Sequence, residues 1–381
     1  MKLRIPDYYT SFQCLADKCK DSCCVGWEID IDEDTLEYYE SITGSFGTRL
    51  KENIIEDGED TCFALKNGRC AFLNDKNLCD ICIELGESSL CEICLEYPRF
   101  TMEYGDTREK CLGLSCEEAG RLIFDRKQPV TFQESYMEEQ YEWQEEEYKE
   151  GEEEESWSES LELVRDYAIQ IMQDRSRVVE DRVKRCLYFA ENIQEAMNER
   201  KFEKFAKIIA LDAENDIKEK GEVQETDEKL RFSLFKQRME LYKTLELLDE
   251  EWEQVWNRMN ALFQSPKIYE ELHNNLCRHY KDRERDYENL FVYFLFRYGM
   301  KAVYDYNFLE KVKFAVISFL VIRDMDAERL SCAQRFTLEE RIDTARIYSK
   351  EVEHSEDNLE ILADACVFEE VMQVQALLKS I

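Results

Sequence analysis

The residues with the clearest chemical potential are twelve cysteines in the first 116 positions of this 381-residue chain. Two CxxC pairs, Cys79/Cys82 and Cys91/Cys94, are separated by eight residues. A CxxC turn lets both thiolates face one metal, so a pair of such turns favours metal binding over simple packing. The other four cysteines are scattered, and we interpret them as packing residues: Cys186, Cys277, Cys332 and Cys366.

Spacing alone leaves the identity of the metal open. Structural zinc takes four ligands per ion, and a [4Fe–4S] cluster takes four thiolates, one for each iron. The eight-residue gap is short for a zinc ribbon. The radical-type motif, with cysteines at x3 and then x2 spacing, is absent because Gly26 stands where a third thiol would follow Cys19 and Cys23. Adjacent Cys23 and Cys24 point in different directions, so we expect only one of them to bind a given ion, while the other packs or serves a second site.

The net charge of −35, from 85 acidic and 50 basic residues, restricts the partners. Such a field repels nucleic acid and anionic membranes and attracts a basic or lysine-bearing surface, although it also serves simple solubility. The longest apolar runs fall short of the roughly 18 residues that a membrane span needs. The segment Met1–Thr10 has no apolar core, so we expect no signal peptide and a cytoplasmic protein without nucleic-acid or membrane partners.

Residues after position 160 are expected to form long helices, because they contain a single proline, Pro266. Residues 286–323 predict two mostly buried helices separated near residues 299–307, and Thr337 with Glu340 predicts a capping box. No strand–helix alternation and no glycine-rich phosphate loop is present, which argues against a doubly wound nucleotide fold.

The chain is therefore predicted to be mainly α, with a small irregular cysteine-rich metal-binding N-terminal domain and a larger all-helical C-terminal domain. We place the cysteine-rich domain at residues 1–125, an acidic linker or flap at 126–160 and the helical domain at 161–381. The acidic segment contains the run Glu152–Glu155 interleaved nearby with aromatic residues, so it is either an exposed linker or helix, or a flap that docks on a partner.

Several blocks of sequence resemble the flagellin lysine-N-methylases, which belong to a broader family of zinc- or iron-chelating proteins with a CxxCxxCC pattern. The N-terminal blocks are FQC…C…SCCVGWEIDID, CAFL…LC…LGE…LCEICLEYPR and LGLSCEEAGRL. The C-terminal blocks are YFLFRYGMKAVYDYNFLEKVKFAVISFLVIRD and YSKEVEHSEDNLEIL, and they point to the methylase branch.

The resemblance implies an iron–sulfur cluster, S-adenosylmethionine as methyl donor, and lysine side chains of flagellin or another lysine-rich surface protein as substrate. Cys62, Cys82 and Cys111 are extra thiols outside the clear pattern. The cysteines that match it are Cys14, Cys19, Cys23, Cys24, Cys70, Cys79, Cys91, Cys94 and Cys116.

The two C-terminal blocks contain the polar candidates for chemistry. A helix would place His354 and Asn358 on one face, at i and i+4, and His354 follows Glu353 directly. We predict catalytic roles for Tyr298, Tyr304, Glu353 and His354, and donor binding by Arg297, Arg323 and Asn358. Structural hydrogen bonds at a helix junction, or ion pairs between helices, would account for the same residues.

Methyl transfer to an amine also requires the lysine to be neutral. A free lysine has a pKa near 10.4, so only about one in 10³ is neutral at pH 7. The site must lower that pKa by desolvation, by the positive charge of the sulfonium, or by a base. Two other functional classes fit the cysteines: a zinc-binding protein-interaction module without catalysis, and an iron–sulfur electron carrier.

Overall fold

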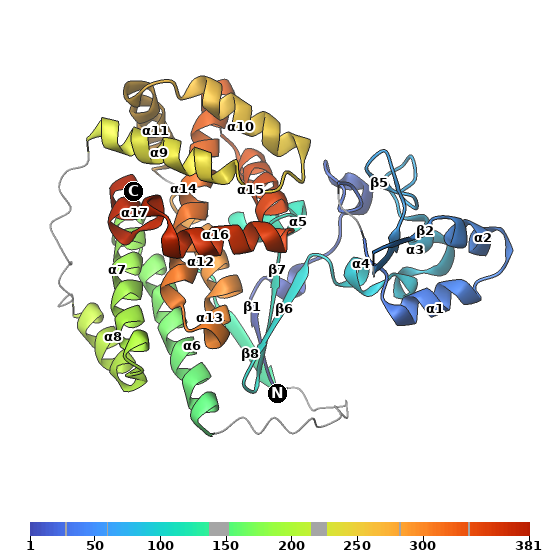
Figure 1. Ribbon diagram of the computed structural model, residues 1–381, viewed down its shortest axis with the longest axis horizontal. Helices are drawn as coiled ribbons and strands as arrows, with labels where there is room; N and C mark the ends of the chain where they lie inside the picture. Colours follow the sequence, from blue (N-terminus) through green and yellow to red (C-terminus); the bar gives the residue numbers. More distant parts are fainter. Residues whose placement is uncertain (27–28, 59, 137–151, 215–226, 282, 334–335) are drawn as a thin grey trace.

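The computed structural model describes residues 1–26, 29–58, 60–136, 152–214, 227–281, 283–333 and 336–381 (Figure 1). Two hydrophobic clusters divide these residues. We call residues 29–96 the cysteine-rich lobe, because the smaller cluster lies wholly within them. The helical body comprises residues 1–12 and all described residues from 99 onward, and residues 13–26 form the cysteine loop between the two.

The cysteine-rich lobe is built from short elements around a small core. Tyr39, Phe63 and Phe72 pack at its centre with ring centroids 5.3–6.0 Å apart. Helix α1 begins where Asp32 caps it, since the Asp32 carboxylate accepts a hydrogen bond from the Thr35 amide. The elements are α1 (Glu33–Ser41), α2 (Gly44–Glu52), β2 (Ile54–Asp57), β3 (Asp60–Phe63), β4 (Leu65–Lys66), β5 (Arg69–Cys70), α3 (Asp80–Leu85) and α4 (Glu92–Glu96).

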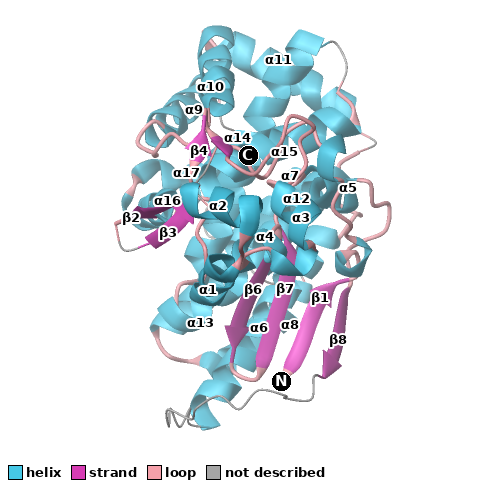
Figure 2. Ribbon diagram, turned by 90° about the vertical axis from the view of Figure 1, so that its right-hand side faces the viewer, coloured by secondary structure: helices cyan, strands magenta, loops and turns pink. Residues whose placement is uncertain are grey.

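A four-stranded sheet joins the lobe to the body, in the order β6-β7-β1-β8 (Figure 2). Strand β1 runs parallel to β7 and antiparallel to β8, and β6 pairs antiparallel with β7. Side chains on one face of the sheet face the large core of the body: Tyr104 belongs to this core and Met102 packs against it. The strands are β1 (Lys2–Pro6), β6 (Arg99–Tyr104), β7 (Thr107–Leu112) and β8 (Phe132–Tyr136).

Helix α14 (Phe308–Ala333) is the centre of the helical body, and the other long helices pack around it. Every residue from Phe314 to Ile322 is buried, as expected for a helix that is apolar on all sides. The surrounding helices are α5 (Glu117–Phe124), α6 (Glu152–Gln173), α7 (Val179–Asn198), α8 (Phe205–Ala213), α9 (Glu228–Tyr242), α10 (Glu250–Leu262), α11 (Pro266–Tyr280), α12 (Arg285–Tyr298), α13 (Ala302–Asp305), α15 (Leu338–Glu353), α16 (Glu356–Phe368) and α17 (Val374–Ser380).

The structure confirms the mainly α fold class and several local predictions. Helices α12 and α14 are separated by short turns at residues 299–307, and α15 begins with the Thr337/Glu340 capping box. None of the described helices is long and apolar enough to cross a membrane. Of the scattered cysteines, Cys186 and Cys366 are buried, whereas Cys277 and Cys332 are exposed.

The segment predicted as an acidic linker contains regular structure at both ends. Strand β8 begins at Phe132 and α6 begins at Glu152, while residues 137–151 lie outside the described part of the chain. Trp157 of α6 is buried and stacks on Tyr306 with ring centroids 5.1 Å apart. Hydrophobic packing also groups β6, β7 and α5 with the helices, and β1 joins them by pairing with β7, whereas the sequence analysis placed these residues with the cysteines.

Candidate functional site

A buried polar cluster forms where α12 and the end of α15 meet strand β6. The hydroxyl groups of Tyr293 and Tyr298 donate hydrogen bonds of 2.8 and 2.7 Å to Glu353 Oε2. Arg297 Nη1 lies 2.6 Å from the same oxygen, and the guanidinium lies 3.4 Å from the ring centroid of Phe100. Glu353 Oε1 is buried and has no hydrogen-bond partner among the described residues. The cluster therefore offers an unused carboxylate oxygen inside the protein.

The electrostatics of this cluster fix the charge states of Arg297 and the two tyrosines. Burial alone would lower the pKa of Arg297, but the Glu353 carboxylate outweighs it and the pKa rises above its ordinary value. Burial raises the pKa values of Tyr293 and Tyr298 well above the ordinary phenol value. The guanidinium is consequently charged and both phenols are neutral hydrogen-bond donors at neutral pH.

His354 lies at the end of α15 and reaches across to the segment between β7 and α5. Its Nε2 lies 2.9 Å from Ser115 Oγ, and Tyr97 donates a 3.1 Å hydrogen bond to the same oxygen. Burial lowers the pKa of His354 to about 4, with further lowering by the positive charges of Arg297 and Lys350. The imidazole is therefore neutral at pH 7.

The first of two thiol groups, the lobe thiol group, lies in the core of the cysteine-rich lobe. Cys70 and Cys91 belong to the small hydrophobic cluster itself, and three further cysteines pack against it. Burial raises the pKa of Cys70 to about 12, with smaller contributions from neighbouring thiols of the group. Its members are Cys24, Cys70, Cys79, Cys91 and Cys94.

The second group, the junction thiol group, lies between the cysteine loop and the start of α5. Burial raises the pKa of Cys19 to about 12, with additional contributions from Glu117, Cys116 and Cys14. Asp21 holds the loop in place, because its amide donates to Glu117 and its carboxylate accepts from Arg346 Nη1 at 2.7 Å. The members of the group are Cys14, Cys19, Cys23 and Cys116.

The two thiol groups meet at Cys23 and Cys24, whose side chains hydrogen bond to each other. This hydrogen bond with Cys23 lowers the pKa of Cys24 to about 7. The junction group also lies near His354. Cys116 and Cys23 both raise the pKa of Tyr97, and Tyr97 bonds to the same Ser115 oxygen that His354 contacts. All nine cysteines that match the family pattern fall into one of the two groups. Cys82 interacts electrostatically with Cys79, at the edge of the lobe group.

These thiols fit a thiolate-bound metal group by donor type and number. Each group contains at least the four thiols that a zinc ion or a [4Fe–4S] cluster takes. Among the residues that the structure describes, however, no three His, Cys, Asp or Glu side chains are arranged as a shell for a single metal ion. The thiols therefore match a metal group in donor type and in proximity, but the described side chains are not arranged in a coordination geometry.

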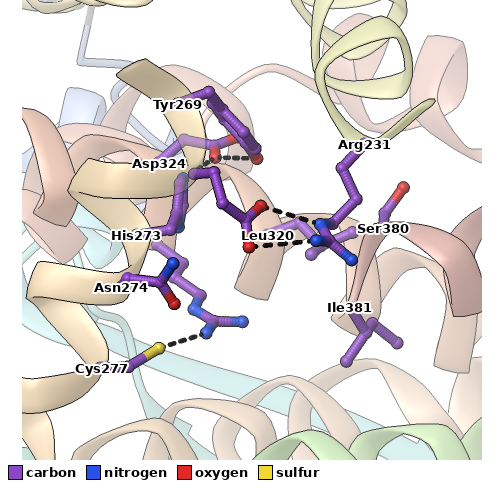
Figure 3. Close-up of a pocket in the computed structure, with 11 residues that line it drawn as sticks. Arg231, Tyr269, His273, Asn274, Cys277, Leu320, Asp324, Ser380 and Ile381 are labelled. Atoms are coloured by element: carbon purple, nitrogen blue, oxygen red, sulfur yellow. Dashed lines mark hydrogen bonds and ion pairs between the residues drawn. The ribbon is translucent and has the colours of Figure 1, made fainter. Parts of the chain in front are cut away.

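Other predicted site residues lie outside the Glu353–His354 region. Arg323 lines a separate cavity of about 180 Å³ between α9, α11, α14 and α17 (Figure 3). There its Nη2 donates to Glu180 at 2.7 Å and to Cys277 Sγ at 2.9 Å. The cavity also contains His273, to which the sequence analysis assigned no role, 2.9 Å from Asp324. Arg297 and Arg323 thus do not converge on one ligand.

Tyr304 and Asn358 have mainly structural contacts. The side chain of Tyr304 is largely exposed, and its hydroxyl donates to the backbone carbonyl of Glu103 at 2.5 Å. Asn358 is buried and bonds to backbone groups of Glu246 and Glu351.

The expected helical face shared by His354 and Asn358 was wrong. Helix α15 ends at Glu353, and Ser355 caps the next helix by accepting from the Asn358 amide. The two residues therefore belong to different helices.

The sequence analysis gave no role to three residues of this region: Ser115, Tyr97 and Phe100. Ser115 directly precedes Cys116, and Tyr97 lies three positions after Cys94 of the second CxxC pair. Their place in the resembling blocks was the only available signal, because neither periodicity nor spacing connects them to α15.

The fold and site together define a mainly helical protein whose polar centre lies against a thiol-rich segment. The sequence-family model of the FliB lysine N-methylase C-terminal domain matches residues 165–379. The chain belongs to this lysine N-methylase family. The match begins after the cysteine-rich part and includes α12 and α15, which provide Arg297, Tyr298, Glu353 and His354.

Curated relatives align over a shorter region. The flagellar biosynthetic protein FliU of Salmonella muenchen is 29% identical over 127 residues, which are 32% of this chain and 75% of FliU. The lysine-N-methylases of Salmonella typhimurium and Salmonella choleraesuis are each 27% identical over 128 residues, or 32% of either chain. The alignment thus spans about a third of these two methylases. No solved structure matches the chain.

Proposed function

We propose that this chain transfers methyl groups from S-adenosylmethionine to lysine side chains of flagellin, or of another lysine-rich surface protein, in the cytoplasm. The activity would depend on a thiolate-bound iron–sulfur cluster. Family membership supports lysine methylation, and the name of FliU, a flagellar biosynthetic protein, supports a flagellar substrate. The density of thiols in the two groups supports the cluster.

The contact between His354 and Ser115 is the observation that carries this proposal. It joins two residues separated by 239 positions and brings the family-matched helices against the residue preceding Cys116. Glu353, with its unused carboxylate oxygen, directly precedes His354 and is the last residue of α15. A polar centre beside a thiol group is the arrangement expected if thiol-bound metal and methyl transfer depend on each other.

In the transfer itself, the lysine nitrogen attacks the methyl carbon, and the carbon–sulfur bond breaks with its electron pair remaining on sulfur. Before attack the ammonium must lose a proton, which requires an acceptor. Glu353 Oε1 is a buried acceptor without a competing partner, and Arg297 with the two phenols fixes its carboxylate. We assign proton acceptance to Glu353.

His354 has a different role from Glu353. Because the pKa of His354 is about 4, its imidazole is neutral at pH 7 and is too weak a base to hold the lysine proton. It instead orients Ser115 through its 2.9 Å contact with the hydroxyl oxygen. Aromatic rings near Arg297 tolerate a second cation at the site, since ring faces attract cations.

The junction thiol group would hold a cluster closest to this centre, and the lobe thiol group would hold a metal further inside the lobe. When bound, an iron–sulfur cluster supplies electron transfer and polarising iron atoms. The surrounding residues keep the cysteine loop in position, because Asp21 is tied to both Arg346 and Lys350.

The test is anaerobic purification with iron and sulfide analysis, followed by donor binding and mass spectrometry of flagellin incubated with donor. We expect stoichiometric acid-labile sulfide and mass increments of whole methyl groups on lysines. The variant Glu353→Gln should bind the cluster but transfer much less methyl. Protein that binds donor but modifies no flagellin lysine contradicts the substrate assignment, and protein that binds no donor contradicts the methylase assignment.

A further inference from the structure

An open groove of about 620 Å³ lies where the cysteine-rich lobe meets the sheet. This volume lies within the ~300–1,000 Å³ typical of binding pockets. Its floor includes Thr101 and Glu103 of β6 with Lys110 of β7, and its wall includes Asp32, Glu92 and Ile93 of the lobe. Figure 2 shows α4 beside the ends of β6 and β7, where the lobe meets the sheet.

The alternation of strand side chains explains why this floor is polar. Thr101 is paired with Lys110 and Glu103 with Arg108, so these four side chains share one face. The neighbouring positions of β6, such as Tyr104, point to the other face and enter the core of the body. The sheet is therefore buried on one side, while its other side is open to a ligand.

Charge favours a cationic occupant of the groove. Its lining contains five carboxylates and three cations, so the local sign matches the negative charge of the whole chain. Glu103 pairs with Arg108 at 2.5 Å, and Glu96 lies 3.6 Å from Lys110. Glu92 forms no ion pair with any other described residue, and its carboxylate is exposed. It remains available for an ammonium group.

We propose that this groove binds an extended, lysine-bearing segment of the protein substrate. The exposed side chain of Ile93 offers apolar contact for lysine methylenes, while Glu92 attracts the ammonium. The groove lies close to the candidate site along the chain, since β6 follows directly after Tyr97–Pro98 and Tyr97 bonds to Ser115. Phe100, on which Arg297 packs, lies on the opposite face of β6, so the groove is a docking surface apart from the Glu353 cluster. This inference rests on the proposed lysine methylation and adds the place where the substrate chain docks.

The chain offers a matched control for the test. Glu92 and Ile93 are exposed neighbours on α4, between the cysteines of one CxxC pair. Ile83 and Glu84 are exposed neighbours on α3, directly after the other pair, and do not line the groove. The double variants Glu92→Lys/Ile93→Ser and Ile83→Ser/Glu84→Lys make the same change of charge and apolarity. Any non-specific attraction of a basic peptide by the acidic protein is therefore weakened equally in both.

The measurement is fluorescence anisotropy of metal-loaded full-length protein with a labelled ten-residue peptide of alternating lysine and serine. We expect the Kd to rise about tenfold in the groove variant and less than about twofold in the control, with equal metal content in both. Equal Kd values in the two variants would overturn the groove.

Steady-state methylation of flagellin separates this inference from the proposed function. A raised KM with unchanged kcat in the groove variant supports docking in the groove. Methylation with an unchanged KM in the groove variant overturns substrate docking in the groove but does not contradict the proposed function. Specific peptide binding without any methyl transfer supports the groove and contradicts the function.

Discussion

The cysteine-rich lobe and the helical body bury polar groups in opposite ways. In the body, buried charges find partners within the chain, as Arg165 does with Glu109 at 2.6 Å and Arg341 does with Asp326. In the lobe, buried Cys70 and Cys91 are part of a hydrophobic core much smaller than that of the body. A core of this size gains little from apolar burial, and domains this small commonly depend on a metal. From this comparison we predict that the body is stable by itself and that the stability of the lobe depends on the proposed metal group.

The largest expected effect is loss of metal from the lobe. Cys91→Ser removes a buried thiol of the proposed metal group, so iron and sulfide should fall sharply and amides of residues 29–96 should exchange hydrogen faster. Amides of α14 should keep their protection because their packing needs no ligand. Hydrogen exchange with mass spectrometry measures both regions together. The exposed Cys332→Ser is the control, and equal metal loss in that variant would contradict the contrast.

The next effect concerns the charge network of the body. In Glu353→Gln, Arg297 remains buried without its carboxylate, which should cost about 3 kcal/mol in the free energy of unfolding. Urea denaturation measures this loss. Glu360→Gln on the exposed face of α16 should change stability by less than about 0.5 kcal/mol. An unchanged free energy of unfolding in Glu353→Gln would show that the contacts of Arg297 with the two phenols stabilise its buried charge sufficiently.

Glu351 gives the body a pH dependence of defined sign. Burial raises its pKa to about 7, partly offset by hydrogen bonds from the amides of Leu248 and Asp249. The folded-state pKa lies above the unfolded value near 4.5, so its contribution to stability is complete below pH 4.5 and is lost as pH rises to 7. Between pH 4.5 and pH 8, the free energy of unfolding of the Glu351→Gln variant should therefore rise by about 2 kcal/mol relative to that of the unsubstituted protein. Denaturation at both pH values tests this, and parallel stability curves would refute it.

The smallest effect is expected where the cysteine loop meets the body. Asp21→Asn weakens the contacts to Arg346 and Lys350, which should cost about 1 kcal/mol and speed proteolysis within residues 13–26. Arg121 pairs with Glu339 between α5 and α15, but both side chains are well exposed. Arg121→Gln should therefore change stability by less than about 0.5 kcal/mol. Faster cleavage of the loop in both variants would contradict a specific role for Asp21.

The sequence by itself determined the local features of this protein. The CxxC spacing identified the thiol-rich part, the capping box at Thr337 located the start of α15, and apolar continuity marked α14 as buried. These features depend on neighbours within a few residues, so the pattern contains their cause. The adjacency of Cys23 and Cys24 likewise predicted that the two thiols would not share one ion. This stays a prediction, because the two side chains hydrogen bond to each other where the two thiol groups meet.

Only the tertiary structure decided which distant residues meet. It paired β1 in parallel with β7, joined His354 to Ser115, and ended a helix between Glu353 and Ser355. It also separated Arg297 from Arg323, although both are arginines of the same C-terminal block. Such contacts depend on how whole faces of helices and sheet are buried together, and no short segment of sequence contains that information.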